Sequence, residues 1–239
     1  MQEMQDFETG GMKWQDTLDS LMELSHVDSE KYLGQILSSD GTNTKNIQKI
    51  KNKGIGIQNK IIQMLDHMPA GMFHFEVAII LRNAYLISSI LSSSEIWYDM
   101  KQHEYDQLEY VDQILIKNLF NCSNSVPSDL LFLELGLVPI KQIIQMRRCL
   151  YLHHLLNQNK NSLLFKFFMA QLENKQQGDW ASQVLTDLEN FQIHLELQEI
   201  QNMSNLKFKS LVKEKVIDFA FTRLTKRQGE RKSENAKGR

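Results

Sequence analysis

The side chains in this sequence whose types and spacing best support a chemical role are five lysines within one predicted helix. Residues 41–60 contain five basic residues and no acidic one, whereas residues 1–40 carry nine acids and two bases. The lysines are Lys45, Lys49, Lys51, Lys53 and Lys60. Ammonium groups concentrated on one helix attract polyanions and make sequence-independent contacts with nucleic-acid phosphates. A solvated face on an ordinary surface helix is the alternative, and on charge alone it is the simpler interpretation.

Residues that bind metals are present but poorly grouped. Cys149 and His153 lie four positions apart on one predicted helix, a spacing that suits two zinc ligands. No paired Cys or His motif supplies the remaining two ligands, so we expect Cys149 to be a core residue. The predicted helix 101–120 also carries four acids, Glu104, Asp106, Glu109 and Asp112. They point in several directions, which favours a solvated acidic face, and we expect no metal site.

Two further pairs of neighbouring residues each have two interpretations. Arg147-Arg148 would contact nucleic acid or form salt bridges with acidic helices, and we favour salt bridges. Trp97-Tyr98 would stack on bases or pack in the core at a helix end, and we favour the core.

The elements that must position these residues are mainly helices. Three prolines in 239 residues leave few helix breakers. An apolar stripe predicts a helix from Asn43 to about Leu65, in which Gly54 and Gly56 indicate a helix crossing or a kink. Further helices are predicted at 73–91, 101–120, 127–136, 140–156, 162–173, 179–191 and 206–224, with a short turn near 197–203. Arg82, in the second of these, would need a partner if buried, and Glu76 and Glu95 are the candidates.

The predicted organisation has four parts. Residues 1–28 form an acidic lead-in, and residues 29–120 form a helical bundle preceded by one short strand near 31–37. Residues 121–224 form a second helical region, and residues 225–239 form a charged tail that we expect to be disordered. The fold class is therefore mainly α with a short β element.

Several short motifs follow one another in a specific order between residues 29 and 224. They are Lys31-Tyr32-Leu33-Gly34, Ser38-Ser39-Asp40-Gly41, Arg82-Asn83-Ala84-Tyr85-Leu86, Ser94-Glu95-Ile96-Trp97-Tyr98, Leu108-Glu109-Tyr110-Val111-Asp112, Leu133-Glu134-Leu135-Gly136-Leu137-Val138-Pro139-Ile140, and Arg147-Arg148 with Tyr151-Leu152-His153-His154. This order resembles the palm end, the thumb and the following region of reverse transcriptases from LINE-type (non-LTR) retrotransposons.

The resemblance implies a role for the first two elements. Tyr32, Leu33 and Gly34 would correspond to the primer-grip strand, and the lysine helix would open the thumb. The thumb of this family grips template–primer duplex through phosphates, so the resemblance implies an RNA or DNA duplex as partner.

The resemblance does not extend to catalysis. Such a polymerase needs paired aspartates to hold two metal ions, and the family carries them in a Tyr/Phe-Ala-Asp-Asp tetrad of the palm. This sequence has no Asp-Asp dipeptide. We therefore expect a non-catalytic fragment with no cofactor of its own, although the parent polymerase would use Mg²⁺. The alternatives are a helical protein-interaction module, whose partner the sequence does not name, or a retroelement remnant without function.

Composition limits the cellular setting. Two cysteines, Cys122 and Cys149, are too few for a disulfide framework, so we expect an intracellular protein, nuclear or cytoplasmic. The longest apolar run, near Val77 to Leu91, is interrupted by Arg82, Asn83 and several serines. It is too polar to span a bilayer, and we expect no membrane partner.

Overall fold

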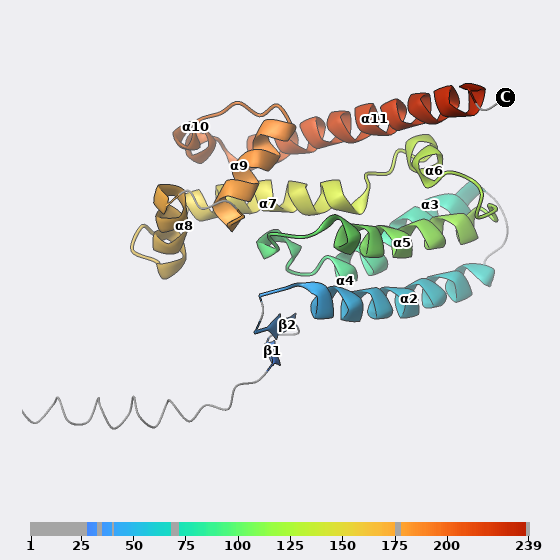
Figure 1. The fold of residues 1–239 in the computed structure, drawn as a ribbon, viewed down its shortest axis with the longest axis horizontal. Helices are drawn as coiled ribbons and strands as arrows, with labels where there is room; N and C mark the ends of the chain where they lie inside the picture. Colours follow the sequence, from blue (N-terminus) through green and yellow to red (C-terminus); the bar gives the residue numbers. More distant parts are fainter. Residues whose placement is uncertain (1–27, 33–34, 40, 68–71, 175–177, 238–239) are drawn as a thin grey trace, which may run out of the picture. The chain divides into compact units, whose positions relative to one another are not determined.

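The mainly α fold predicted from the sequence is confirmed by a computed structural model of the chain (Figure 1). The structure describes residues 28–32, 35–39, 41–67, 72–174 and 178–237. The chain forms two compact units, Met1–Asn46 and Ile47–Arg239. Most of the predicted acidic lead-in, residues 1–27, lies outside the described residues.

The first unit contains an antiparallel pair of short strands, β1 (Ser29–Tyr32) and β2 (Gln35–Ser38). Tyr32 pairs with Gln35 and Ser29 with Ser38. The prediction of one strand over 31–37 was therefore wrong: the chain reverses within that span, because two strands satisfy each other's backbone N–H and C=O groups. Of the primer-grip-like residues, Tyr32 ends β1, and Leu33 and Gly34 lie outside the described residues.

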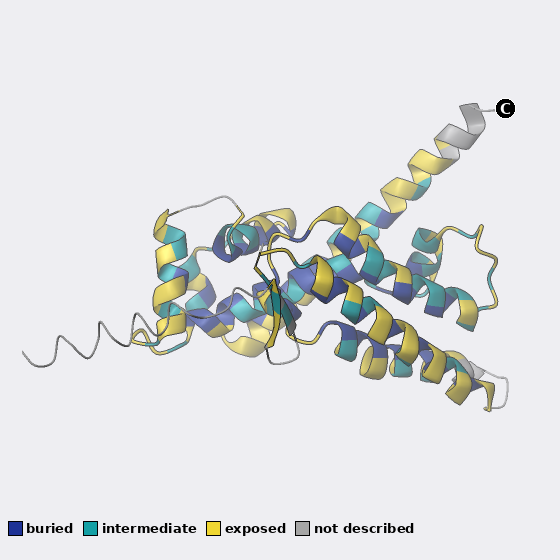
Figure 2. Ribbon diagram, turned by 60° about the horizontal axis from the view of Figure 1, so that its bottom comes forward, coloured by how far each residue is buried: buried dark blue, intermediate teal, exposed yellow. Residues whose placement is uncertain are grey.

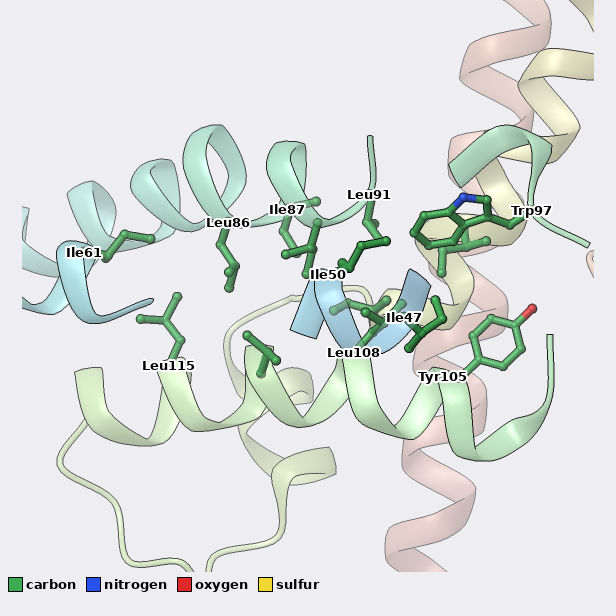
Figure 3. Packing of buried hydrophobic residues seen from close by; sticks show 14 of the residues in the cluster. Ile47, Ile50, Ile61, Leu86, Ile87, Leu91, Trp97, Tyr105, Leu108 and Leu115 are labelled. Carbon is green, nitrogen blue, oxygen red and sulfur yellow. The ribbon is translucent and has the colours of Figure 1, made fainter. Parts of the chain in front are cut away.

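The N-terminal half of the second unit is built around α5. Its elements are α2 (Thr44–Asp66), which begins in the first unit, α3 (Met72–Leu81), the π-helix η1 (Arg82–Ile87), α4 (Ser88–Ile90), the 3₁₀ turn η2 (Ser94–Ile96) and α5 (Gln102–Leu119). Figure 3 shows their apolar side chains meeting, with Ile47, Ile50 and Ile61 of α2 facing the core. Burial of such side chains stabilises each by about 1.5–3 kcal/mol.

The C-terminal half is organised by α7. Its helices are α6 (Ser128–Glu134), α7 (Ile140–Leu156), α8 (Leu163–Asn174), α9 (Trp180–Asn190), α10 (Leu197–Asn202) and α11 (Asn205–Lys237). Pro139 precedes α7, where its fixed φ and missing N–H are tolerated. Ile140 and Ile144 of α7 belong to the core shared with α2 and α5, whereas Cys149 and Leu152 belong to a second core with α8 to α11.

Two predicted boundaries differ from the structure. The segment near residue 121, expected to separate two helical regions, lies inside the second compact unit, because α7 contributes to both cores. The tail expected to be disordered from residue 225 is instead the continuation of α11, which reaches Lys237. A reason for this extension is visible on its surface: Arg227 and Arg231 lie 3.8 and 3.1 Å from the carboxylate of Asp129 on α6.

Candidate nucleic-acid interface

The helix α2 is held by a buried stripe of its own residues. Ile47, Ile61 and Leu65 are almost fully buried, as expected from their spacing on one helix face. At the start of the helix, the Asn46 side-chain oxygen accepts a hydrogen bond from the backbone N–H of Ile36, at 3.2 Å. This face sets the rotation of α2 and so determines which side of the helix is exposed (Figure 2).

Gly54 marks a close crossing between α2 and its neighbours. A Cβ atom at this position would lie 2.9 Å from Cγ1 of Val111 on α5 and 3.1 Å from Cγ2 of Ile90 on α4. The interpretation of Gly54 as a helix-crossing residue is thereby confirmed. Gly56, two residues further, is exposed, and a Cβ atom there would meet nothing within 4 Å.

Lys49, Lys53 and Lys60 share one side of α2. At 3.6 residues per turn they fall within about 40° of one another, and their mean direction is about 115° from that of the buried stripe. Lys45 begins the same row, four residues before Lys49. Lys53 and Lys60 are exposed and Lys49 is half-buried, and the Lys53 ammonium group donates to the Ser89 carbonyl at 3.3 Å. These four side chains are called the lysine row below.

Lys51 does not belong to the lysine row, although the sequence grouped it with the other four. It is half-buried on another side of α2, and its Nζ lies 5.6 Å from the ring centroid of Tyr110 on α5. Helical periodicity separates residue 51 from residues 49 and 53, a signal already present in the spacing. Its contact with Tyr110, in contrast, depends on how α2 packs against α5.

The surface around the lysine row carries no negative charge from its own helix. The only acid within α2 is Asp66, at the C-terminal end. Asn59 and Gln63 are exposed near the row, as is Gly56. Amide side chains donate to phosphate oxygens, and a glycine allows a close backbone approach, so this face suits a phosphate backbone.

Three arginines of α11 lie close to acidic or buried polar groups of neighbouring helices. Arg227 and Arg231 lie next to Asp129, and Arg223 is half-buried in a polar pocket between α5, α6, α7 and α11. Burial lowers the pKa of the Arg223 guanidinium, and the nearby Arg227 lowers it further. In the same pocket burial raises the pKa of the Glu109 carboxyl, whereas the backbone N–H of Lys141 donates to this group at 3.3 Å and lowers that pKa.

Arg82 of η1 forms a salt bridge with Asp112, which we had expected on a solvated face. Arg82 donates through Nε to Oδ1 of Asp112 at 2.6 Å, and both side chains are fully buried. The expected partners Glu76 and Glu95 were wrong, and so was the assignment of Asp112 to a solvated face. Glu104, from the same predicted acidic face, is also buried, and its carboxylate accepts from the Lys101 backbone N–H at the start of α5.

Arg148 has a structural role rather than an exposed one. Its guanidinium contacts the Asp187 carboxylate of α9 at 2.8 Å and donates to the Trp97 carbonyl at 2.9 Å. This confirms the salt-bridge interpretation for Arg148. Arg147 is half-buried and donates to the Leu91 carbonyl. Both arginines therefore stabilise the packing of α7.

The two neighbouring aromatic residues differ in burial. Trp97 is buried and belongs to the core, as we favoured, whereas Tyr98 is half exposed. Cys149 is fully buried, and burial raises the pKa of its thiol well above the ordinary value, so the thiolate is disfavoured. Within the described ranges, no group of three or more His, Cys, Asp and Glu side chains is positioned to hold a metal ion.

Searches of family models, curated protein sequences and solved structures find no match to this chain. Among the described helices, none combines the length and the apolar character that crossing a membrane requires.

Proposed function

We propose that the lysine row of α2 binds the phosphate backbone of a nucleic-acid duplex without reading its sequence. The supporting observation is that Lys49, Lys53 and Lys60 lie within about 40° of one another on α2, outside its buried face, with Lys53 and Lys60 exposed and Lys49 half-buried. The order of short motifs between residues 29 and 224 resembles that of LINE-type reverse transcriptases, and this resemblance implies the same partner, because the thumb of that family contacts template–primer duplex.

The dimensions of the row fit several phosphates. From Lys45 to Lys60 the helix rises about 22 Å at 1.5 Å per residue. Phosphates of one strand follow one another about every 3.4 Å along the axis of a DNA duplex. The row therefore spans several phosphates of a strand, and the long lysine side chains can adjust to them.

The absence of aromatic side chains from α2 favours a duplex over a single strand as the partner. Proteins that bind single strands stack aromatic side chains on successive bases, with about 1–3 kcal/mol per base. No residue between Thr44 and Asp66 is aromatic. The contacts offered are ammonium groups and amides, which recognise the backbone and not the bases.

The experiment is a fluorescence anisotropy titration of an RNA–DNA hybrid duplex of about 20 base pairs between 50 and 200 mM KCl. If three lysines each contact a phosphate, K49Q/K53Q/K60Q reduces the slope of log K against log salt by about 2.7, at 0.9 per contact. Affinity should fall similarly for duplexes of unrelated sequence.

A matched control removes the same charge elsewhere. Lys207, Lys209 and Lys213 are exposed on α11, so K207Q/K209Q/K213Q lowers the net charge equally and leaves the lysine row intact. The proposal requires this control to bind almost as the original chain does. Equal losses in both variants would show that total charge drives binding, and tighter binding of single strands would exclude the duplex as the preferred partner.

A further inference from the structure

An aromatic groove lies on a different part of the second unit from the lysine row. It has a volume of about 290 Å³ and is formed by η2, α7, α8 and α9. Five of its nine lining residues are aromatic, namely Tyr98, Tyr151, Phe167, Phe168 and Trp180. The rest are aliphatic except for Gln171. Its size lies near the lower limit for small-molecule pockets, about 300 Å³.

The rings around the groove are held at steep angles to one another. Trp180 lies edge-on to Tyr151, with centroids 5.8 Å apart and planes at 89°, and edge-on to Phe168 at 5.9 Å and 76°. The indole N–H of Trp180 donates to the Glu95 carbonyl at 2.8 Å, which fixes this ring. These two pairs of rings therefore meet at steep angles, whereas Tyr151 stacks on His154, with centroids 5.6 Å apart and planes at 26°.

The electrostatic character of the groove selects against anions. Among the described residues that line it, none carries a formal charge. The faces of aromatic rings carry partial negative charge and attract cations. The Glu95 carboxylate adds to this, since together with burial it raises the pKa of the Tyr151 phenol. The nearby Arg147 does not line the groove; its guanidinium donates to the Leu91 carbonyl and to the Ser94 hydroxyl.

We propose that this groove binds a small organic cation of the trimethylalkylammonium class. A cation whose charge is spread over methyl groups has a weak hydration shell and packs against several ring faces at once. A bare ammonium ion would lose strong hydration for few side-chain acceptors, since only Tyr98, Tyr151 and Gln171 of the lining carry side-chain oxygen atoms. Gln171 supplies the one side-chain amide in the lining, too few polar groups for the backbone of an extended peptide.

The test compares two ligands of the same shape by isothermal titration calorimetry on the full chain. Choline carries a trimethylammonium group, and 3,3-dimethylbutan-1-ol replaces its charged nitrogen with carbon. We expect choline to bind saturably and at least about tenfold more tightly than the alcohol. Equal binding of both would show a general apolar groove, and absence of saturable choline binding would also overturn the proposal.

Substitutions in the lining distinguish the contribution of the aromatic ring faces to choline binding from that of apolar contact in general. Phe167 and Tyr98 are at least half exposed, so F167L and Y98L should fold while removing π faces and keeping apolar contact. Each should weaken choline several-fold and leave the alcohol almost unaffected. L163A is the control, because Leu163 is 84% exposed on α8 and does not line the groove.

Two further ligands complete the test. A trimethyl-lysine peptide that binds more tightly than choline would overturn the assignment to a small molecule. Adenosine binding more tightly than choline would identify a nucleobase site instead. Unchanged choline affinity in F167L and Y98L would show that these aromatic rings do not bind the cation.

Discussion

Replacing Gly54 by alanine tests the closest helix crossing in the second unit. The added methyl group would lie 2.9 Å from a methyl group of Val111 and 3.1 Å from one of Ile90, and both of these side chains are fully buried. Neither side chain can move into solvent, so the crossing itself must widen. Overpacking of this kind costs about 1–3 kcal/mol.

Gly56 provides the internal standard for this change. Alanine is favoured over glycine within a helix by about 1 kcal/mol, and at Gly56 the new methyl group meets nothing within 4 Å. We therefore expect G56A to raise the free energy of unfolding by up to about 1 kcal/mol. The same gain in helix propensity applies to G54A, so that the free energy of unfolding of G54A should fall by about 0–2 kcal/mol in total. The difference between the variants, about 1–3 kcal/mol, isolates the steric cost of the crossing.

The assay is urea unfolding followed by circular dichroism at 222 nm, with unchanged m-values as the condition for comparing the variants. In a V111A background, G54A should destabilise the protein less than it does in the original chain, because the clashing methyl group of Val111 is gone. The difference is the coupling energy, about 0.5–3 kcal/mol. Equal stability of G54A and G56A would refute the crossing geometry. So would a G54A cost that is unchanged by V111A.

Three further predictions concern buried groups. R82M should lower the free energy of unfolding by about 3–5 kcal/mol in urea titrations, because Asp112 would be left charged and uncompensated, and R82M/D112L should recover most of this loss. E109Q should stabilise the protein at pH 7.5, because burial raises the pKa of Glu109 and its charged form therefore costs stability above that pKa. In thermal melts, the stability advantage of E109Q over the original chain should vanish as the pH falls below the usual range for a glutamate. With Ellman's reagent at pH 8, Cys122 should react in the folded protein, whereas Cys149 should react only at the rate of unfolding; rapid modification of two thiols would contradict the buried position of Cys149.

Local features of the chain are read reliably from the sequence because neighbouring residues encode them. The span Ile140–Leu156 was predicted as a helix from the preceding proline and the apolar pattern, and α7 has these bounds. The lysine row follows from the same logic, since residues four apart share a helix side whatever the helix packs against. That periodicity also separates Lys51 from the row, although the sequence interpretation did not use it.

Partners that are far apart in the chain were decided only by the tertiary structure. Arg82 and Asp112 are 30 positions apart, and Arg148 and Asp187 are 39 apart. Asp112 has the composition and setting of a surface acid, and only the packing of α5 against η1 makes it buried. No local pattern states which of several acids a distant arginine will meet.

The same division holds for the surfaces with proposed functions. The lysine row was determined by sequence, because a repeat of about four residues within a helix is a property of the local chain. The aromatic groove was not, because Tyr98, Tyr151, Phe167 and Trp180 belong to η2, α7, α8 and α9 or to residues beside them and meet only when these elements pack. Within a helix, backbone hydrogen bonds join residues four apart, so the local sequence determines which side chains share a face. Burial depends on the whole fold and brings together side chains that are far apart in the sequence.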